Sequence, residues 1–236
     1  MRNYFTFNSN DSRTYGVYIS GSGVYNAPEH VYDAIKIPGR NGDLLIDRHK
    51  FENIKVTYPA FICDDFKNKL ASLRSMLLSQ NGYQKLVDSY HTDEYRMAYF
   101  AGGINVKPRE QNDAGEFDLT FICKPQRFLN SGDTATTITS STGTISNPTL
   151  FDSKPLIRVT GYGTLTIGSD VITIANTYAY VDIDSELQDC YHGTDNANGQ
   201  VTFQNNNFPV LKPGTNNIAK SGNITSVKIT PRWFIV

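Results

Sequence analysis

The chain has 236 residues and a mass of 26.4 kDa, and 39% of its residues are hydrophobic, so it is long enough to bury one large core or two ordinary ones. A formal net charge of -1 with only 19% charged residues argues against the basic face that nonspecific nucleic-acid binding requires. No apolar run approaches the roughly 20 residues of a membrane helix, and the first residues show no signal-peptide pattern, so we expect a chain that stays in the cytoplasm where it is made.

Short runs of alternating apolar and polar residues, separated by Gly, Asn, Asp and Pro, are typical of half-buried strands. The clearest run places Phe117, Leu119, Phe121 and Cys123 on one face and polar residues on the other. We therefore expect a mainly β fold. In the first half, further strands are expected at residues 15–19, 32–37, 44–47, 54–60, 84–88 and 96–100.

Turn-forming residues interrupt this pattern within residues 35–46. The segment contains a Pro-Gly pair and an Asn-Gly pair; proline fixes φ, and Asn-Gly accepts positive φ. These pairs predict a hairpin or extended arm with Arg40 at its tip. An arm of this kind could reach a neighbouring molecule.

Residues 64–79 are the one segment with a helical pattern. Apolar side chains recur at i, i+4, i+7 and i+11, which predicts an amphipathic helix that packs one face on a sheet. Asp64 and Asp65 suit the positive N-terminal end of the helix dipole, and Gly82 is placed to end the helix. The apolar stripe consists of Phe66, Leu70, Leu73 and Leu77.

Between residues 129 and 152 the composition shifts to Ser, Thr, Gly and Asn with almost no charge. We place a domain boundary there, giving domains of residues 1–130 and 131–236. The second is rich in turn formers and predicts a small β-sandwich. Trp233, the only tryptophan, follows its last strand, where the ring would close the core. The expected strands are 156–159, 164–167, 171–174, 179–183 and 227–229.

Motifs that would carry catalysis or hold a cofactor are missing from the sequence. Neither G-x-S-x-G nor a phosphate-cradling loop occurs, and none of the four histidines has metal-ligand spacing. The cysteines Cys63, Cys123 and Cys190 are odd in number and far apart, which argues against a disulfide framework or a zinc site. We expect Cys63 and Cys123 to be small buried hydrophobic residues, and we expect no enzyme activity, no metal and no cofactor.

Asp182 and Asp184 lie at i and i+2 on an expected strand and would share one face. A carboxylate pair could serve a glycoside hydrolase or a calcium site. An EF-hand fails because Leu187 stands where the loop needs Gly and Gly193 stands where it needs Glu. We interpret the pair as solvated residues at a strand edge that discourage association.

Several strings of residues occur in a characteristic order along the whole chain. In the first half, around the single expected helix, they are Tyr4-Phe5-Thr6-Phe7-Asn8, Tyr15-Gly16-Val17, Ile37-Pro38-Gly39-Arg40-Asn41-Gly42-Asp43-Leu44, and Phe117-Asp118-Leu119-Thr120-Phe121 running into Lys124-Pro125-Gln126-Arg127-Phe128. In the second half they are Lys212-Pro213-Gly214-Thr215-Asn216-Asn217-Ile218, Gly222-Asn223-Ile224-Thr225 and Ile229-Thr230-Pro231-Arg232-Trp233. In this order the chain resembles the distal tail (Dit) proteins of siphophages, which have long, noncontractile tails.

The resemblance implies an N-terminal β-sandwich with one α-helix and a hairpin or belt extension, followed by a C-terminal galectin-like β-sandwich. It implies a ring, usually hexameric, in which the belt packs on the next subunit. Such a ring is the hub of a baseplate: it joins the tail tube protein to the tail-associated tip protein, passes DNA through its channel and carries receptor-binding proteins during host adsorption. The chain would then be a structural virion protein of the phage tail, assembled in the host cytoplasm.

The resemblance also assigns roles to residues. The string Ile37 to Leu44 would form the belt, while Lys124 to Phe128 and Pro231, Arg232 and Trp233 would be structural motifs. A galectin-like fold does not imply sugar binding, because function lies in the site. The alternative hypothesis is therefore a carbohydrate-binding host-adhesion module in the C-terminal domain, with Tyr178 and Tyr191 as sugar-binding residues.

Overall fold

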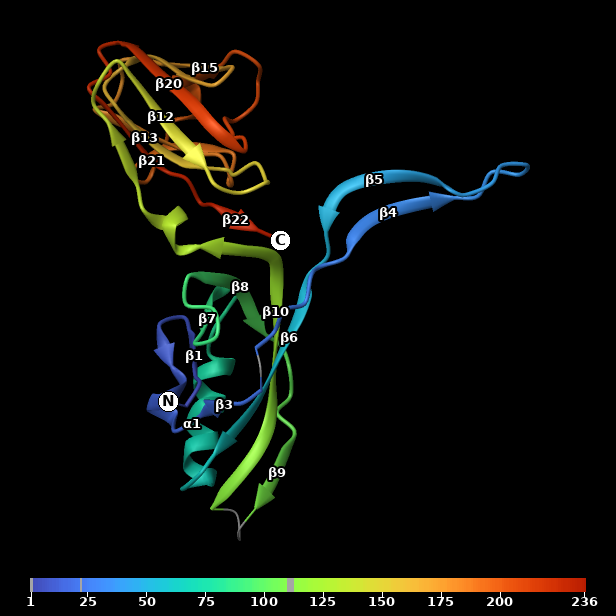
Figure 1. Cartoon of the computed structure of the whole chain (residues 1–236). Coiled ribbons are helices and arrows are strands. Elements are labelled where there is room, and N and C mark those ends of the chain that lie inside the picture. The colour runs from blue at the N-terminus through green and yellow to red at the C-terminus, as the bar shows by residue number, and fades with distance from the viewer. Residues whose placement is uncertain (1, 22, 110–112) are drawn as a thin grey trace. The chain divides into compact units, whose positions relative to one another are not determined.

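The computed structural model describes residues 2–21, 23–109 and 113–236, and it is built mainly from antiparallel strands (Figure 1). The chain divides into two compact units, Met1–Arg127 with Val236, and Phe128–Ile235. Each unit has its own cluster of buried hydrophobic side chains. The expectation of a mainly β fold is confirmed.

One twisted sheet forms most of the first unit. The chain folds this sheet over itself, so that Phe5 stacks on Tyr58 at 6.2 Å between ring centroids and Phe7 contacts Phe121 at 5.2 Å. These aromatic rings lie at the centre of the core. In sheet order the strands are β2 (Asn10–Asp11), β1 (Phe5–Phe7), β7 (Gln84–Asp88), β8 (Glu94–Phe100), β10 (Ala114–Leu129), β6 (Ile54–Ile62) and β3 (Tyr18–Ile19), with β9 (Val106–Arg109) also paired to β10.

The predicted helix is present as α1 (Phe66–Leu78), and its four predicted stripe residues are all buried in the same core as the sheet. Its N-terminus lies directly on β10, where a Cβ on Gly115 would come within 2.5 Å of the Phe66 ring. The predicted N-terminal contacts differ: Asp65 makes no side-chain cap, and Asp64 pairs with Lys69. Ser79, not Gly82, is the residue that ends the helix.

Two further local predictions for the first unit are wrong. Residues 15–19 are not one strand, because Ser12–Tyr15 forms a 3-10 helix and Gly16 leaves it with φ of 64°. The Asp11 side chain begins that helix by accepting from the backbone N–H of Arg13 at 2.8 Å. Cys63 is exposed, since it follows the end of β6 and leaves the sheet there.

The remaining two strands of the first unit, β4 (His30–Ile35) and β5 (Leu44–Phe51), pair with each other and, among the described residues, with no other strand (Figure 1). The loop between them is residues 36–43. We call this ribbon, residues 30–51, the arm.

The second unit is a β-sandwich of two sheets around one core. The strands of the first sheet are, in order, β11 (Thr136–Ile138), β21 (Ser226–Thr230), β13 (Leu156–Thr160), β16 (Tyr180–Asp184), β17 (Asp189–His192) and β18 (Asp195–Asn196). Those of the second are β12 (Thr142–Asn147), β20 (Gly214–Gly222), β14 (Gly163–Ile167), β15 (Asp170–Ile174) and β19 (Val201–Phe203). The final strand, β22 (Phe234–Ile235), runs beside the end of β10, where the N–H of Leu129 donates to the carbonyl of Trp233 at 2.9 Å.

Candidate functional site

The arm is the feature of the first unit whose conformation the packing of that unit's own core does not explain. Its register places Ile35 opposite Leu44, and the backbone N–H of Arg40 donates to the carbonyl of Ile37 at 3.2 Å. Gly39 and Gly42 both have positive φ, as the Pro-Gly and Asn-Gly pairs predict. The predicted hairpin with Arg40 at its tip is therefore confirmed.

Large apolar side chains cover the part of the arm next to its tip, and they are exposed. Leu44, Leu45 and Ile46 follow one another on β5, so apolar groups face solvent on both sides of the ribbon. Single exposed apolar residues are ordinary, whereas a contiguous set on one projecting element marks an interaction surface. The exposed set, between 38% and 60% accessible, is Tyr32, Ile35, Ile37, Leu44, Leu45 and Ile46.

Polar side-chain contacts hold together the half of the arm that lies away from the tip. Asp33 on β4 pairs with Arg48 on β5, and His30 Nε2 lies 3.0 Å from Asp47 Oδ1. The backbone N–H of His49 donates to Asp47 at 2.7 Å and lowers the pKa of that carboxyl. The arm is thus held together by polar contacts at the end away from its tip, and it has an exposed apolar surface next to its tip.

In the second unit, the predicted motif at Pro231, Arg232 and Trp233 ties the end of the chain to the sandwich. Ser153 Oγ donates to the Pro231 carbonyl at 2.7 Å. The Arg232 guanidinium donates twice to the Asp184 carboxylate, at 2.7 and 2.8 Å. Trp233 is only 5% exposed and belongs to the core, as predicted.

Comparison with known proteins gives a result at the level of structure only. No family model matches the chain, and no curated protein does. The crystal structure of the SPP1 Dit protein (gp 19.1), described as a paradigm of the hub adsorption apparatus in Gram-positive infecting phages, matches with a TM-score of 0.76 at 11% identity over 100% of both chains. The structure of the phage p2 baseplate, in its activated conformation with Sr, matches with a TM-score of 0.51 at 10% identity, covering 96% of this chain and 97% of that one.

The fold is that of a phage distal tail protein. The expected resemblance to the Dit family is thereby confirmed in architecture, over the whole length of the chain. Among the described residues no helix is long and apolar enough to cross a membrane.

On this distal tail fold, the second predicted motif lies within β10, near the C-terminal end of that strand. Arg127 Nη1 donates to Glu94 Oε1 at 3.0 Å, and the ring of Phe128 contacts that of Phe234 at 6.1 Å. These contacts stabilise β10 at the point in the sequence where the first unit ends and the second begins. The structural role assigned to the motif stays a prediction. The motif residues are Lys124, Pro125, Gln126, Arg127 and Phe128.

The interpretation of Asp182 and Asp184 as solvated edge residues is wrong. Both are buried, and β16 lies inside its sheet between β13 and β17. Asp182 accepts two hydrogen bonds from Arg158 at 2.7 Å, and Asp184 pairs with Arg232. The two carboxylates share a face as predicted, but each is fully engaged by its own arginine, so the pair is structural.

The two predicted sugar-binding tyrosines lie in different surroundings. Tyr178 stacks on the His192 ring at 4.7 Å between centroids, and Tyr180 contacts the same ring at 4.3 Å. Tyr191 lies opposite Asp182 in the sheet, and burial raises the pKa of its hydroxyl. Among the described rings, Tyr191 is not part of the stack around His192, and a sugar-binding role for either tyrosine stays a prediction.

A polar network in the core of the first unit has no counterpart among the sequence motifs. Tyr58 Oη donates to Asp88 Oδ2 at 2.7 Å, and His91 Nδ1 lies 3.1 Å from Asp88 Oδ1. The neighbouring Arg96 is buried, and burial lowers the pKa of its guanidinium. The cavity among these groups measures about 10 Å³, which is no larger than one water, so the network has no room for a substrate.

Proposed function

We propose that this chain is a structural component of a siphophage tail, a ring at the distal end that joins the tail tube to the tail tip. The observation that carries the proposal is the match of the entire chain to the SPP1 hub protein, in a molecule that also presents an uncovered apolar arm. In this role the chain acts by binding other proteins and performs no chemistry. Its predicted location is the virion tail, after assembly in the host cytoplasm.

We assign the arm to the contact between neighbouring copies, through the loop Ile37 to Leu44 and the apolar strand residues beside it. A hairpin that reaches out on one side of a subunit makes a head-to-tail contact, and such contacts generate a ring when the rotation closes. A stable contact of this kind buries well over roughly 1,000 Å². We expect a hexamer, as the resemblance to the Dit family implies.

We assign the remaining binding partners from the proposed position of the ring at the end of the tail. The tail tube protein would bind on one side of the ring, the tail-associated tip protein on the other, and receptor-binding or other baseplate proteins on the C-terminal domains. DNA only passes through the channel. The net charge of -1 suits a conduit, because phosphate binding needs an excess of Lys and Arg.

The test is the assembly state of the purified chain and of one arm variant. We expect light scattering to give a closed oligomer and negative-stain images to show rings. Leu45→Lys should shift the protein to monomers, because it places a charge in the apolar contact. Since Leu45 is 60% exposed in the single chain, this change should leave the fold intact.

The matched control is Leu150→Lys, a leucine in the second unit that is 88% exposed. It should assemble as the unmodified chain does. A chain that stays monomeric at high concentration would contradict the proposed ring, and a Leu45→Lys variant that still forms rings would contradict the assignment of the arm.

A further inference from the structure

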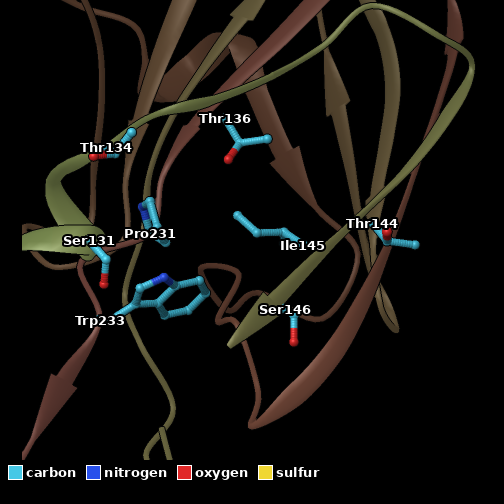
Figure 2. A pocket seen from close by; sticks show the side chains of 8 residues that line it. All are labelled: Ser131, Thr134, Thr136, Thr144, Ile145, Ser146, Pro231 and Trp233. Atoms are coloured by element: carbon cyan, nitrogen blue, oxygen red, sulfur yellow. The ribbon is translucent and has the colours of Figure 1, made fainter. Parts of the chain in front are cut away.

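A pocket of about 460 Å³ opens at one side of the C-terminal sandwich, between β11 and β12, the edge strands of its two sheets (Figure 2). This volume lies in the range of small-molecule sites. All of its lining belongs to the second unit. The lining residues are Ser131, Thr134, Thr136, Thr144, Ile145, Ser146, Pro231 and Trp233.

The pocket has an apolar floor and a hydroxyl rim. Ile145, Pro231 and Trp233 are buried and form the floor, whereas the five serine and threonine residues are exposed. No lining residue carries a charge. This combination disfavours an anion or a metal ion and favours a neutral ligand with both C–H and O–H surface.

The polar groups around the floor are free to bind a ligand. Within the described part of the chain, neither the indole N–H of Trp233 nor the hydroxyl of any lining serine or threonine has a hydrogen-bond partner. Trp233 as a residue is only 5% exposed, yet its Nε1 is not among the fully buried atoms without a partner in the described part of the chain, so this N–H is open to solvent. In Figure 2 the nitrogen-bearing edge of Trp233 faces the space bounded by Ile145 and Thr136, and the Thr136 hydroxyl points toward Ile145.

We infer that this pocket binds one unit of a neutral saccharide. The C–H face of a sugar ring would lie on the apolar floor, while its hydroxyl oxygens accept from Trp233 Nε1 and exchange hydrogen bonds with Thr136. An extended peptide is the less suitable occupant, because strand addition needs a row of apolar pockets for alternate side chains and this edge offers one apolar floor. The site is separate from Tyr178 and Tyr191, and it does not depend on ring formation.

The sole tryptophan makes the pocket directly observable in the full-length chain. A ¹⁵N-labelled sample has a single indole N–H resonance, that of Trp233. We expect this resonance to move in a saturable way on titration with at least one of glucose, galactose, N-acetylglucosamine or lactose, at millimolar concentrations. Thr136→Val keeps the β-branched shape and removes the hydroxyl, and it should weaken binding about fivefold.

Thr137→Val is the matched control, because Thr137 is on the same strand but does not line the pocket. It should bind like the unmodified chain. The inference is overturned if none of the four sugars moves the resonance, if only an extended peptide does, or if Thr136→Val and Thr137→Val bind equally well. Light scattering on the same samples reports assembly separately, so failure of sugar binding and failure of the ring are distinguishable.

Discussion

Arg232 shows how a single residue fixes the C-terminal end of the chain. It adopts a left-handed backbone conformation with φ of 58°, which costs a non-glycine residue of order 1 kcal/mol. The conformation is held because its N–H donates to the carbonyl of Gly132 at 2.8 Å and its guanidinium binds Asp184 through both oxygens. Gly132 must be glycine there, since a Cβ would lie 2.3 Å from the Trp233 nitrogen.

The Asp184 carboxylate makes the stability of the second unit sensitive to acid. Burial alone would raise its pKa, but the hydrogen bonds from Arg232 and from the backbone N–H groups of Leu187 and Glu186 outweigh burial and lower it below the ordinary 3.8. A carboxyl with a lowered folded pKa stabilises the fold above its unfolded pKa, and this contribution is lost as the pH falls through the folded value.

We therefore expect Asp184→Asn to reduce the free energy of unfolding of the second unit by about 2–3 kcal/mol at pH 7. The loss should shrink as the pH falls below the ordinary carboxyl pKa of 3.8, because the unfolded chain takes up its proton first and the folded Asp184 is protonated only at a still lower pH. Urea unfolding from pH 7 to pH 3 measures both effects. An equal loss at every pH would contradict this role for the charge of Asp184.

At the scale of elements, the stripe of α1 is the clearest case in which sequence periodicity predicts packing. Leu73 is fully buried in the core of the first unit, whereas Leu78, in the last turn of the same helix, is 67% exposed. Leu73→Ala should cost about 2–5 kcal/mol, because it removes buried methyl groups and leaves a cavity.

Leu78→Ala is the internal control for this prediction, since it makes the same change on the same helix at an exposed position. It should cost less than about 0.5 kcal/mol. Chemical unfolding followed at the helical signal near 222 nm compares the two variants. Equal costs would contradict the packing of α1 on the sheet through the face that carries Leu73.

Elements with a strict pattern were predictable, and contacts between distant residues were not. The alternation through Phe117 and Phe121 and the turn pairs around Arg40 specify local geometry, so the sequence alone located β10 and the arm. The burial of Asp184 depends on Arg232, 48 residues further along the chain. The hydroxyl rim of the pocket had a compositional signal, the Ser- and Thr-rich segment after residue 129, but that composition indicated only a domain boundary.

At the scale of the whole molecule, the two units have separate cores and separate reporters. Trp233, the sole tryptophan, lies in the core of the second unit, and α1, the long helix among the described residues, lies in the first. In a monomeric Leu45→Lys background we expect tryptophan emission and the 222 nm signal to give different unfolding midpoints. Superimposed curves would show that the two units unfold together.

The arm is held together by polar contacts at one end and carries exposed apolar side chains next to its tip. This arrangement has a consequence for the order of assembly. An isolated two-stranded ribbon is only marginally stable in water, and its outer edges carry unpaired backbone groups. In a closed ring of identical copies, every ribbon would bind one neighbouring subunit. In a partial arc, one subunit would always keep an exposed ribbon that binds no neighbour. If the chain assembles into the proposed ring, completion of the ring is favoured over arrest at a partial arc, and each new chain has to bind its neighbours before its exposed ribbon causes aggregation.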